Sequence, residues 1–374
     1  MQQMSLIDFL PQDQQEQYRP KKSTDWKWSF KDYPKEKNGL KVFSCFACGG
    51  GSTMGYKLAG CDVIGCCEID PKMNAIYIKN HHPKHNFCMD IRVFNDIPNK
   101  ELPKELFNLD ILDGSPPCTT FSMSGDREES WGKKKKFREG QAEQTLDDLS
   151  FVLVETVAKV RPKVVIIENV EGLIKGEAWS YVQRIYKELN EVGYDVKHYL
   201  CKGETMGVPQ KRHRVIFIAV KKEFNFNFDR LDMSFNYEPV YFGQIKSKNG
   251  IDIKGDTYHD LFTYYVEGDE SLAEANIRRK NQCSFFNNKW IYDNKVAPTL
   301  PAKRVNIRAD QKKWMSNEDI IRISTFPSDY DFGTDHNSFI HYVCGMSVPP
   351  IMIKRIVERL IESGVFSNEN DKGN

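Results

Sequence analysis

The sequence predicts an α/β fold with a mostly parallel sheet, covered by helices on both faces, and a smaller irregular region. Between residues 40 and 220, short apolar runs alternate with segments in which apolar residues recur at helical spacing. The apolar runs are nearly continuous, which is typical of strands buried on both faces. After residue 221 this alternation stops, and the chain becomes rich in Phe, Asn and charged residues.

The predicted strands are short apolar segments that end at glycine, polar or acidic residues. The last two of them look like an adjacent pair. In chain order the segments are 40–46, 62–70, 109–114, 164–170, 195–201 and 214–220.

The predicted helices follow apolar stripes in residues 146–160 and 179–192. A further helix is predicted within residues 346–364, where Ser347 is a candidate N-cap, two prolines fit the first turn and Gly364 can end the helix. Because this helix is so apolar, we expect the chain to return to its first domain. The expected parts are a polar arm whose aromatic residues dock on the core, a main domain, an irregular domain and a returning segment, at 1–38, 39–220, 221–300 and 301–374.

Composition excludes several classes of protein. Lys and Arg number 53 against 52 Asp and Glu, so positive charge for binding nucleic acid must be placed locally. The chain has no apolar run of about 18 residues and starts without a signal pattern, so we expect neither a membrane protein nor a secreted one. A cytoplasmic location, in the bacterial cytosol or nucleoid, is expected instead.

The ten cysteines are expected in a reducing compartment. Cys45 and Cys48 form a Cys-x-x-Cys pair, and a zinc site is one interpretation of it. Cys66 and Cys67 are adjacent rather than spaced, and both pairs sit in strand-like apolar runs. Buried thiols that pack as small hydrophobic groups are therefore favoured.

A glycine cluster, FACGGGSTMG at 46–55, follows the first predicted strand. Such a turn lets the backbone approach a ligand at the start of a helix, although a tight turn without a ligand is the alternative. Glu68 ends the second strand, where an acid commonly accepts hydrogen bonds from ribose hydroxyls. The pair Asp90 and Ile91 is suited to an adenine amino group and ring. Solvated surface acids remain the alternative for both.

The segment DGSPPCTTFSMSG, residues 113–125, carries the strongest chemical signal. Two prolines stiffen the loop that presents Cys118, which favours a nucleophile over a structural thiol. Glu168 leaves the next apolar strand and can donate a proton there. Arg212 and Arg214 alternate, so they project to one side, where they can anchor Glu168, a phosphate or both. An ordinary basic strand edge is the alternative for the arginines.

In this order, the segments resemble the cytosine-C5 DNA methyltransferase family. The resemblance covers residues 40–220 and 290–362 and rests on FACGGG, CCEID, DI, SPPCTTFSMSG, TL in EQTLDD, ENV, QKRHR and GMSVPP. DNA enzymes that methylate an amino group carry an aromatic residue after the double proline, where this chain has Cys118. The resemblance implies an S-adenosylmethionine-dependent methyltransferase (Rossmann-like) fold. Residues 39–220 then form the cofactor-binding and catalytic domain, and 221–300 the target-recognition domain.

The resemblance also implies roles for residues. Cys118 attacks C6 of a flipped-out cytosine, Glu168 contacts N3 and the exocyclic amine, and Arg212 and Arg214 orient both the acid and the base. Glu68 holds the cofactor's ribose. The residues implied to bind S-adenosylmethionine are Phe46, Gly49, Gly50, Gly51, Glu68, Asp90, Ile91, Pro116, Leu146 and Ser347. No metal is implied.

Double-stranded DNA is the implied partner, with a cognate restriction endonuclease that acts on the same site, and a monomer without membrane contact is expected. Residues 119–144, with Lys133–Lys136, are expected to form a lid over DNA, against the alternative of a solvated charge run. The first alternative function is an RNA cytosine-C5 methyltransferase, against which the bulk of 221–300 argues. The second is a nicotinamide oxidoreductase or a binding protein, which leaves Cys118 and Glu168 unexplained.

Two positions depart from the family pattern. Cys48 replaces the first glycine of the cofactor loop, and Met346 replaces an Asn. We expect Cys48 to fit only if its φ is below zero. The change at Met346 removes a hydrogen-bonding group, which can weaken cofactor binding or shift the contact to the backbone.

Overall fold

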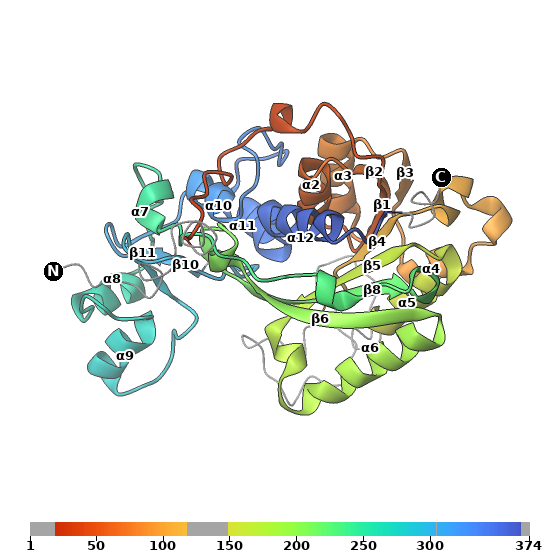
Figure 1. Cartoon of the computed structure of the whole chain (residues 1–374). Coiled ribbons are helices and arrows are strands. Elements are labelled where there is room, and N and C mark those ends of the chain that lie inside the picture. Colours follow the sequence, from red (N-terminus) through yellow and green to blue (C-terminus); the bar gives the residue numbers. More distant parts are fainter. Residues whose placement is uncertain (1–18, 118–148, 304, 368–374) are drawn as a thin grey trace.

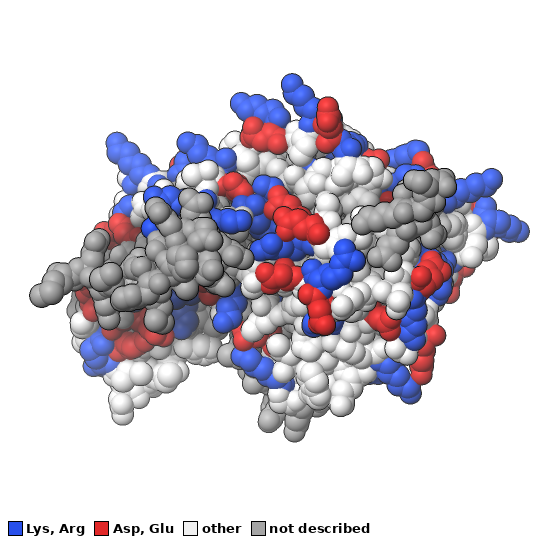
Figure 2. All heavy atoms as spheres, viewed as in Figure 1, with Lys and Arg blue, Asp and Glu red and all other residues white. Residues whose placement is uncertain are grey.

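The computed structural model describes residues 19–117, 149–303 and 305–367 (Figure 1). Within these residues, none of the helices combines the length and apolar content that crossing a bilayer requires. On the face seen in Figure 2, positive and negative side chains are interspersed rather than gathered into a single patch.

A seven-stranded sheet forms the centre of the molecule. Its strands are β1 (Lys41–Cys45), β2 (Asp62–Cys67), β3 (His85–Phe87), β4 (Ile111–Gly114), β5 (Val164–Val170), β6 (Tyr194–Lys202) and β8 (His213–Lys221). Their order is β3-β2-β1-β4-β5-β8-β6. Pairing is parallel from β3 to β5, and β8 runs antiparallel to both β5 and β6. The predicted mostly parallel sheet and all six predicted strands are confirmed, whereas β3 was not predicted because it is short and only partly buried.

Helices cover both faces of the sheet. Successive side chains of a strand point to opposite faces, so each face presents apolar residues on which helices pack. Val165 and Ile167 pack in one apolar cluster with α5 and α6, and Val164 and Ile166 pack in another with α12. The bounds are α2 (Gly51–Leu58), α3 (Pro71–His81), α4 (Ile91–Asp96), α5 (Leu149–Val160), α6 (Trp179–Glu191) and α12 (Pro350–Glu362). The predicted helices α5 and α6 are confirmed, although Trp179 is exposed, so the buried stripe of α6 starts at Val182.

The C-terminal helix α12 packs closely on α2, next to the sheet. A Cβ on Gly55 would lie 2.5 Å from the Pro350 carbonyl oxygen, so only glycine allows this approach. The return of the chain to the sheet is thus visible, but the N-cap prediction for Ser347 is wrong. Ser347 ends α11 (Asn337–Met346), where its hydroxyl donates to the Val343 carbonyl at 2.8 Å, and Pro349 is the N-cap of α12.

Between β8 and α11 the described chain forms short elements, which matches the irregular sequence there. A small apolar cluster of its own includes Leu261, Leu272, Trp290 and Trp314. In Figure 1, α8 and α9 lie on the side of the molecule opposite to α4 and α5. The elements are α7 (Phe242–Ile245), α8 (Asp256–Thr263), α9 (Leu272–Lys280), α10 (Asn317–Ile323), β9 (Trp290–Ile291), β10 (Ala297–Pro298), β11 (Ile307–Arg308) and β12 (Lys313–Trp314). The strand β10 pairs with β7 (Gln210–Lys211), which precedes β8.

The N-terminal arm docks on the C-terminal half of the chain. Trp28 is buried, and its indole Nε1 donates to the Thr325 carbonyl at 2.8 Å. Trp26 and Phe30 pack against the same apolar cluster. The predicted docking of these aromatic residues is therefore confirmed.

Candidate active site

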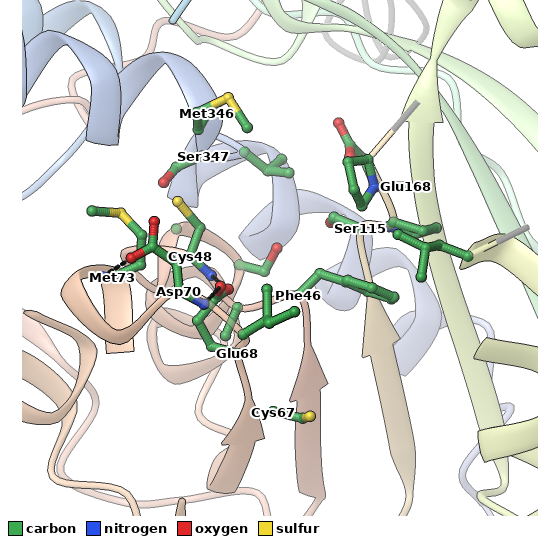
Figure 3. Close-up of a pocket in the computed structure, with 18 of the residues that line it drawn as sticks. Phe46, Cys48, Cys67, Glu68, Asp70, Met73, Ser115, Glu168, Met346 and Ser347 are labelled. Carbon is green, nitrogen blue, oxygen red and sulfur yellow. Dashed lines mark hydrogen bonds between the residues drawn. The ribbon is translucent and has the colours of Figure 1, made fainter. Parts of the chain in front are cut away.

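A cavity of about 300 Å³ opens at the carboxyl ends of the parallel strands (Figure 3). Ligands bind at this edge in open α/β sheets, because the loops that leave several strands converge there. Residues that follow β1, β2, β3 and β4 contribute, together with the last residues of β5, the start of β8 and the turn after α11. Figure 3 shows Glu68, Asp70 and Met73 toward one end, Glu168 and Ser115 toward the other, and Phe46 between them.

The end of the cavity near β5, here called the acid–arginine end, is defined by Glu168, Arg212 and Arg214. Arg214 Nε lies 2.7 Å from Glu168 Oε1, and both side chains are largely buried. Arg212 is 3% exposed and donates to the Gly345 carbonyl at 3.2 Å. Its Nε is buried without a hydrogen-bond partner among the described residues. Arg212 also lines the cavity wall.

Burial lowers the pKa of Arg212 to about 9, and neighbouring Arg214 acts in the same direction, while Glu168 opposes both. The guanidinium therefore stays charged at neutral pH. Two guanidinium groups thus face one carboxyl at this end of the cavity, an arrangement suited to a polar, planar ligand.

The opposite end, here called the backbone-held end, is organised around Glu68. Its Oε2 accepts the Cys48 N–H at 2.7 Å, and its Oε1 accepts the Asp70 N–H at 2.8 Å. Burial raises the pKa of Glu68, and these two backbone hydrogen bonds oppose that shift. The backbone thus holds the carboxyl in place, while its remaining lone pairs can accept from hydroxyls.

The expectation of a negative φ at Cys48 is wrong, because its φ is 47°. This left-handed conformation costs about 1–2 kcal/mol for a residue with a Cβ. The hydrogen bond from its N–H to Glu68 and the packing of its thiol in an apolar cluster offset that strain. Burial, with Glu68 nearby, raises the pKa of the Cys48 thiol to about 12, so it stays protonated and unreactive at neutral pH.

Two further acids at this end cap helices. Asp70 accepts the N–H groups of Lys72 and Met73 at the start of α3, at 2.8 and 3.3 Å. Asp90 accepts the Arg92 N–H at the start of α4, at 2.9 Å. N-caps fix the direction of the carboxylates, and both residues line the cavity.

The glycine turn contributes to the cavity unevenly. Gly51 lies on the wall, and Gly49 and Gly50 do not. The Gly49 carbonyl accepts from the Tyr330 hydroxyl at 2.6 Å, so it faces the protein. Gly50 has a φ of 83°, and a Cβ there would lie 2.1 Å from His81 Nε2. Gly50 therefore serves the turn and its packing.

Asp113 lies near the cavity and received no role from the sequence. It is 1% exposed, and its carboxyl accepts from the Ser44 hydroxyl at 2.7 Å and the Tyr56 hydroxyl at 3.0 Å. Burial raises its pKa to about 7, against the hydrogen bonds, and Glu168 adds to the rise. An acid inside the apolar run ILDG was the signal that could have identified it.

The structure brings most of the sequence-derived site residues to one cavity. Cys118, Leu146 and the segment 119–144 with Lys133–Lys136 lie outside the described residues, although Pro117, just before Cys118, lines the wall. The candidates on the wall are Phe46, Gly51, Glu68, Asp90, Ile91, Pro116, Glu168, Arg212, Arg214 and Ser347. Wall residues that sequence reasoning did not select include Ser52 and Val348, which lie inside quoted motifs but received no role, and Met73, Met89 and Tyr342, which no motif marks.

The cysteines in the described part of the chain are free thiols. Cys45, Cys66 and Cys67 are buried. Across residues 19–117, 149–303 and 305–367, no group of three or more His, Cys, Asp or Glu side chains is arranged to hold a metal ion.

Comparison with known sequences adds a family assignment to this geometry. The model of the family described as C-5 cytosine-specific DNA methylase matches residues 40–362. The Type II methyltransferase M.FnuDI of Fusobacterium nucleatum is 30% identical over 191 residues, which is 51% of this chain and 50% of that protein. The chain thus spans about half the length of this relative. The Type II methyltransferase M.AplI of Arthrospira platensis is 23% identical over 321 residues, or 85% of each chain.

Comparison with solved structures supports the fold. A mutant of DNMT2 from Spodoptera frugiperda superposes with a TM-score of 0.60 and 15% identity. The superposition covers 86% of this chain and 100% of that one. At this level of identity the similarity bears on the fold alone.

Proposed function

The chain belongs to the C-5 cytosine-specific DNA methylase family, and on that premise we propose that it transfers a methyl group from S-adenosylmethionine to C5 of cytosine in a specific duplex sequence. The observation that carries this proposal is the single cavity that joins the backbone-held end to the acid–arginine end. A donor and an acceptor that must exchange a methyl group need such a shared space.

The backbone-held end suits S-adenosylmethionine. The Glu68 carboxyl can accept hydrogen bonds from ribose hydroxyls, and Asp90 can accept one from the adenine amino group. Phe46 and Ile91 offer apolar surface for the ring. Several carboxyl groups at one end of the cavity also favour a cationic sulfonium ligand. When bound there, the cofactor supplies a methyl group from its sulfonium and leaves as a neutral thioether.

The acid–arginine end suits a cytosine. Glu168 can give a proton to N3 and accept a hydrogen bond from the exocyclic amine, and its pairing with Arg214 holds it in one orientation. The guanidinium of Arg212, which lines the same cavity, can donate to the ring's carbonyl oxygen. A base in a duplex is stacked and out of reach, so the target cytosine is flipped out at a cost of a few kcal/mol.

We assign the nucleophile to Cys118, which follows the cavity-lining residue Pro117. The Cys118 thiolate forms a bond to C6, while N3 takes the proton from Glu168 and the displaced electron pair makes C5 an enamine carbon. C5 then bonds to the methyl group, and N3 returns its proton. Loss of the C5 proton to a base restores the C5–C6 double bond and expels the Cys118 thiolate.

We further propose that residues 221–300 read the target sequence and that the enzyme acts as a monomer on double-stranded DNA, in the bacterial cytosol or nucleoid. We also propose a role as the modifying half of a restriction–modification system, beside an endonuclease of the same specificity; the similarity to Type II methyltransferases supports this proposal.

The test is methyl transfer in vitro from labelled S-adenosylmethionine to mixed-sequence duplex DNA and, in parallel, to transfer RNA. We expect 5-methylcytosine in the DNA alone, and no product from Cys118→Ser. Transfer to RNA alone would replace the proposal with the RNA enzyme, and full activity of Cys118→Ser would refute the nucleophile.

A further inference from the structure

His213 lies between the two arginines of the site and has no role in the proposed reaction. Neighbouring residues of a strand point to opposite faces, so His213 faces away from the side on which Arg212 and Arg214 meet the cavity. Its ring reaches two carboxyl groups. Nδ1 lies 3.1 Å from Glu171 Oε2, and Nε2 lies 2.7 Å from Glu204 Oε1.

The two carboxyl groups belong to different segments that flank the site. Glu171 starts the short 3-10 helix η6 (Glu171–Ile174), directly after β5 and three residues beyond Glu168. Glu204 lies in η8 (Gly203–Thr205), directly after β6. The imidazolium form of His213 carries a proton on each ring nitrogen, and in that form it donates to both carboxylates at once. One side chain thus connects β8 to the ends of both neighbouring strands.

The register explains why this connection matters for the reaction. Arg214 is paired with Val170 of β5 and with Cys201 of β6. On the cavity side, Arg214 Nε bonds to Glu168 Oε1 at 2.7 Å, and on the other side His213 bonds to Glu171. Two contacts from adjacent residues of β8, one on each side of the strand, therefore fix the end of β5 against the start of β8.

We infer that His213 is a positioning residue, which holds Arg212 and Arg214 at the distance from Glu168 that the reaction requires. This inference rests on the proposed function, since it assigns the arginines and the acid to catalysis. The hydrogen bond from Lys175 and, after it, that from His213 lower the pKa of Glu171, so this carboxyl stays charged at neutral pH. A metal site is not favoured, because the carboxyl groups sit on opposite nitrogens of the ring.

Other side chains of the QKRHR segment contact different parts of the molecule from those that His213 contacts. Gln210 is held from the other direction, since its side chain accepts the Leu300 N–H at 3.1 Å and donates to the Ile323 carbonyl at 3.4 Å. Arg212 donates to the Gly345 carbonyl. These contacts tie the segment to the C-terminal third of the chain. His213 instead contacts Glu171 and Glu204, in the segments that follow β5 and β6, and Arg214 contacts Glu168 within β5.

The experiment compares the full-length protein with His213→Ala, with His213→Arg, and with His198→Ala as a matched control. His198 is a partly buried histidine of β6, hydrogen-bonded to the Tyr186 hydroxyl at 2.8 Å and absent from the cavity wall. Steady-state methyl transfer to mixed-sequence duplex DNA, cofactor affinity and thermal unfolding are measured for each. Amide hydrogen exchange is followed in residues 168–172 and 212–214.

We expect His213→Ala to lower kcat about tenfold while the cofactor Kd stays within about twofold, because the acid and its arginines lose their alignment. Exchange at the ends of β5 and β8 should become faster. The His213→Arg variant has donors on two sides and should regain most of the kcat. His198→Ala should lower the melting temperature without a comparable loss of kcat.

Unchanged kcat and unchanged exchange in His213→Ala would overturn the inference, as would a loss of kcat in His198→Ala of the same size. If the alanine variant does not fold, His213→Gln, which keeps a donor toward one carboxyl, should show a partial loss of kcat, and full kcat would count against the inference. An inactive wild-type protein would refute the proposed function instead. In that case hydrogen exchange alone still decides whether His213 holds the two strands together.

Discussion

The two ends of the cavity are built from different kinds of contact. At the acid–arginine end, charged side chains hold one another, as in the pair of Glu168 and Arg214. At the backbone-held end, the carboxyl groups of Glu68, Asp70 and Asp90 accept from backbone N–H groups of loops and helix starts. A backbone donor is fixed by the fold, whereas a side-chain donor can move with its ligand. The first end is therefore suited to a reacting base, and the second to a bound cofactor.

If one end binds the reacting base and the other the cofactor, substitutions at the first end should lower kcat and substitutions at the second should weaken cofactor binding. The largest effect is expected for Glu168→Gln, which keeps the shape of the side chain but removes the proton donor. We expect kcat to fall by about 10²–10⁴-fold, the range for loss of a general acid. Cofactor affinity, measured by calorimetry, should change by less than about threefold. An equal fall in affinity and kcat would mean that the ends are not independent.

The corresponding substitution at the backbone-held end is Glu68→Ala. It removes the acceptor for the ribose and leaves the N–H groups of Cys48 and Asp70 without their partner. We expect the cofactor Kd to rise by about 10–100-fold, since unmade hydrogen bonds to a charged group cost about 1.5–3 kcal/mol. At saturating cofactor, kcat should stay near that of the wild type. A low kcat under saturation would place Glu68 in the chemical step.

Asp113 is buried and is influenced by Glu168 of the acid–arginine end, and its ionisation should affect stability. In the folded chain its pKa is raised from 3.8 to about 7, so the folded state binds this proton more tightly than the unfolded state. The resulting stabilisation is complete below about pH 4 and is lost as pH rises through about 7. Asp113→Asn removes this titration. Its free energy of unfolding, relative to wild type, should rise by about 2 kcal/mol between about pH 5 and pH 8, measured by urea unfolding. A difference that does not depend on pH would contradict the assignment.

The smallest effect concerns the strain that supports the backbone-held end. Cys48→Gly and Cys48→Ala both remove the thiol, but only glycine adopts a positive φ without strain. Cys48→Gly should therefore be more stable than Cys48→Ala by about 1 kcal/mol, which thermal unfolding can resolve. Equal stability would show that the left-handed conformation carries no strain here.

The same contrast decides what the sequence could predict. The strands, α5, α6 and the acids at strand ends could be predicted from the sequence, because apolar spacing and strand-end acids are local patterns. The φ of Cys48 and the true place of Ser347 were not, since tertiary contacts, such as the N–H donation from Cys48 to Glu68, determine them. The hydrogen-bonded, buried state of Asp113 was not predicted, because its partners, Ser44 and Tyr56, lie far away in the chain. Contacts between distant segments thus set the limit of the prediction.

The central claim is that one cavity brings a methyl donor to an extruded cytosine. It is tested most directly by mapping 5-methylcytosine, base by base, in DNA from cells that express the chain or its Cys118→Ala variant. The account predicts methylation at one recurrent short sequence in the first case and none in the second. Unmodified cytosines in both, or the same methylation in both, would contradict it.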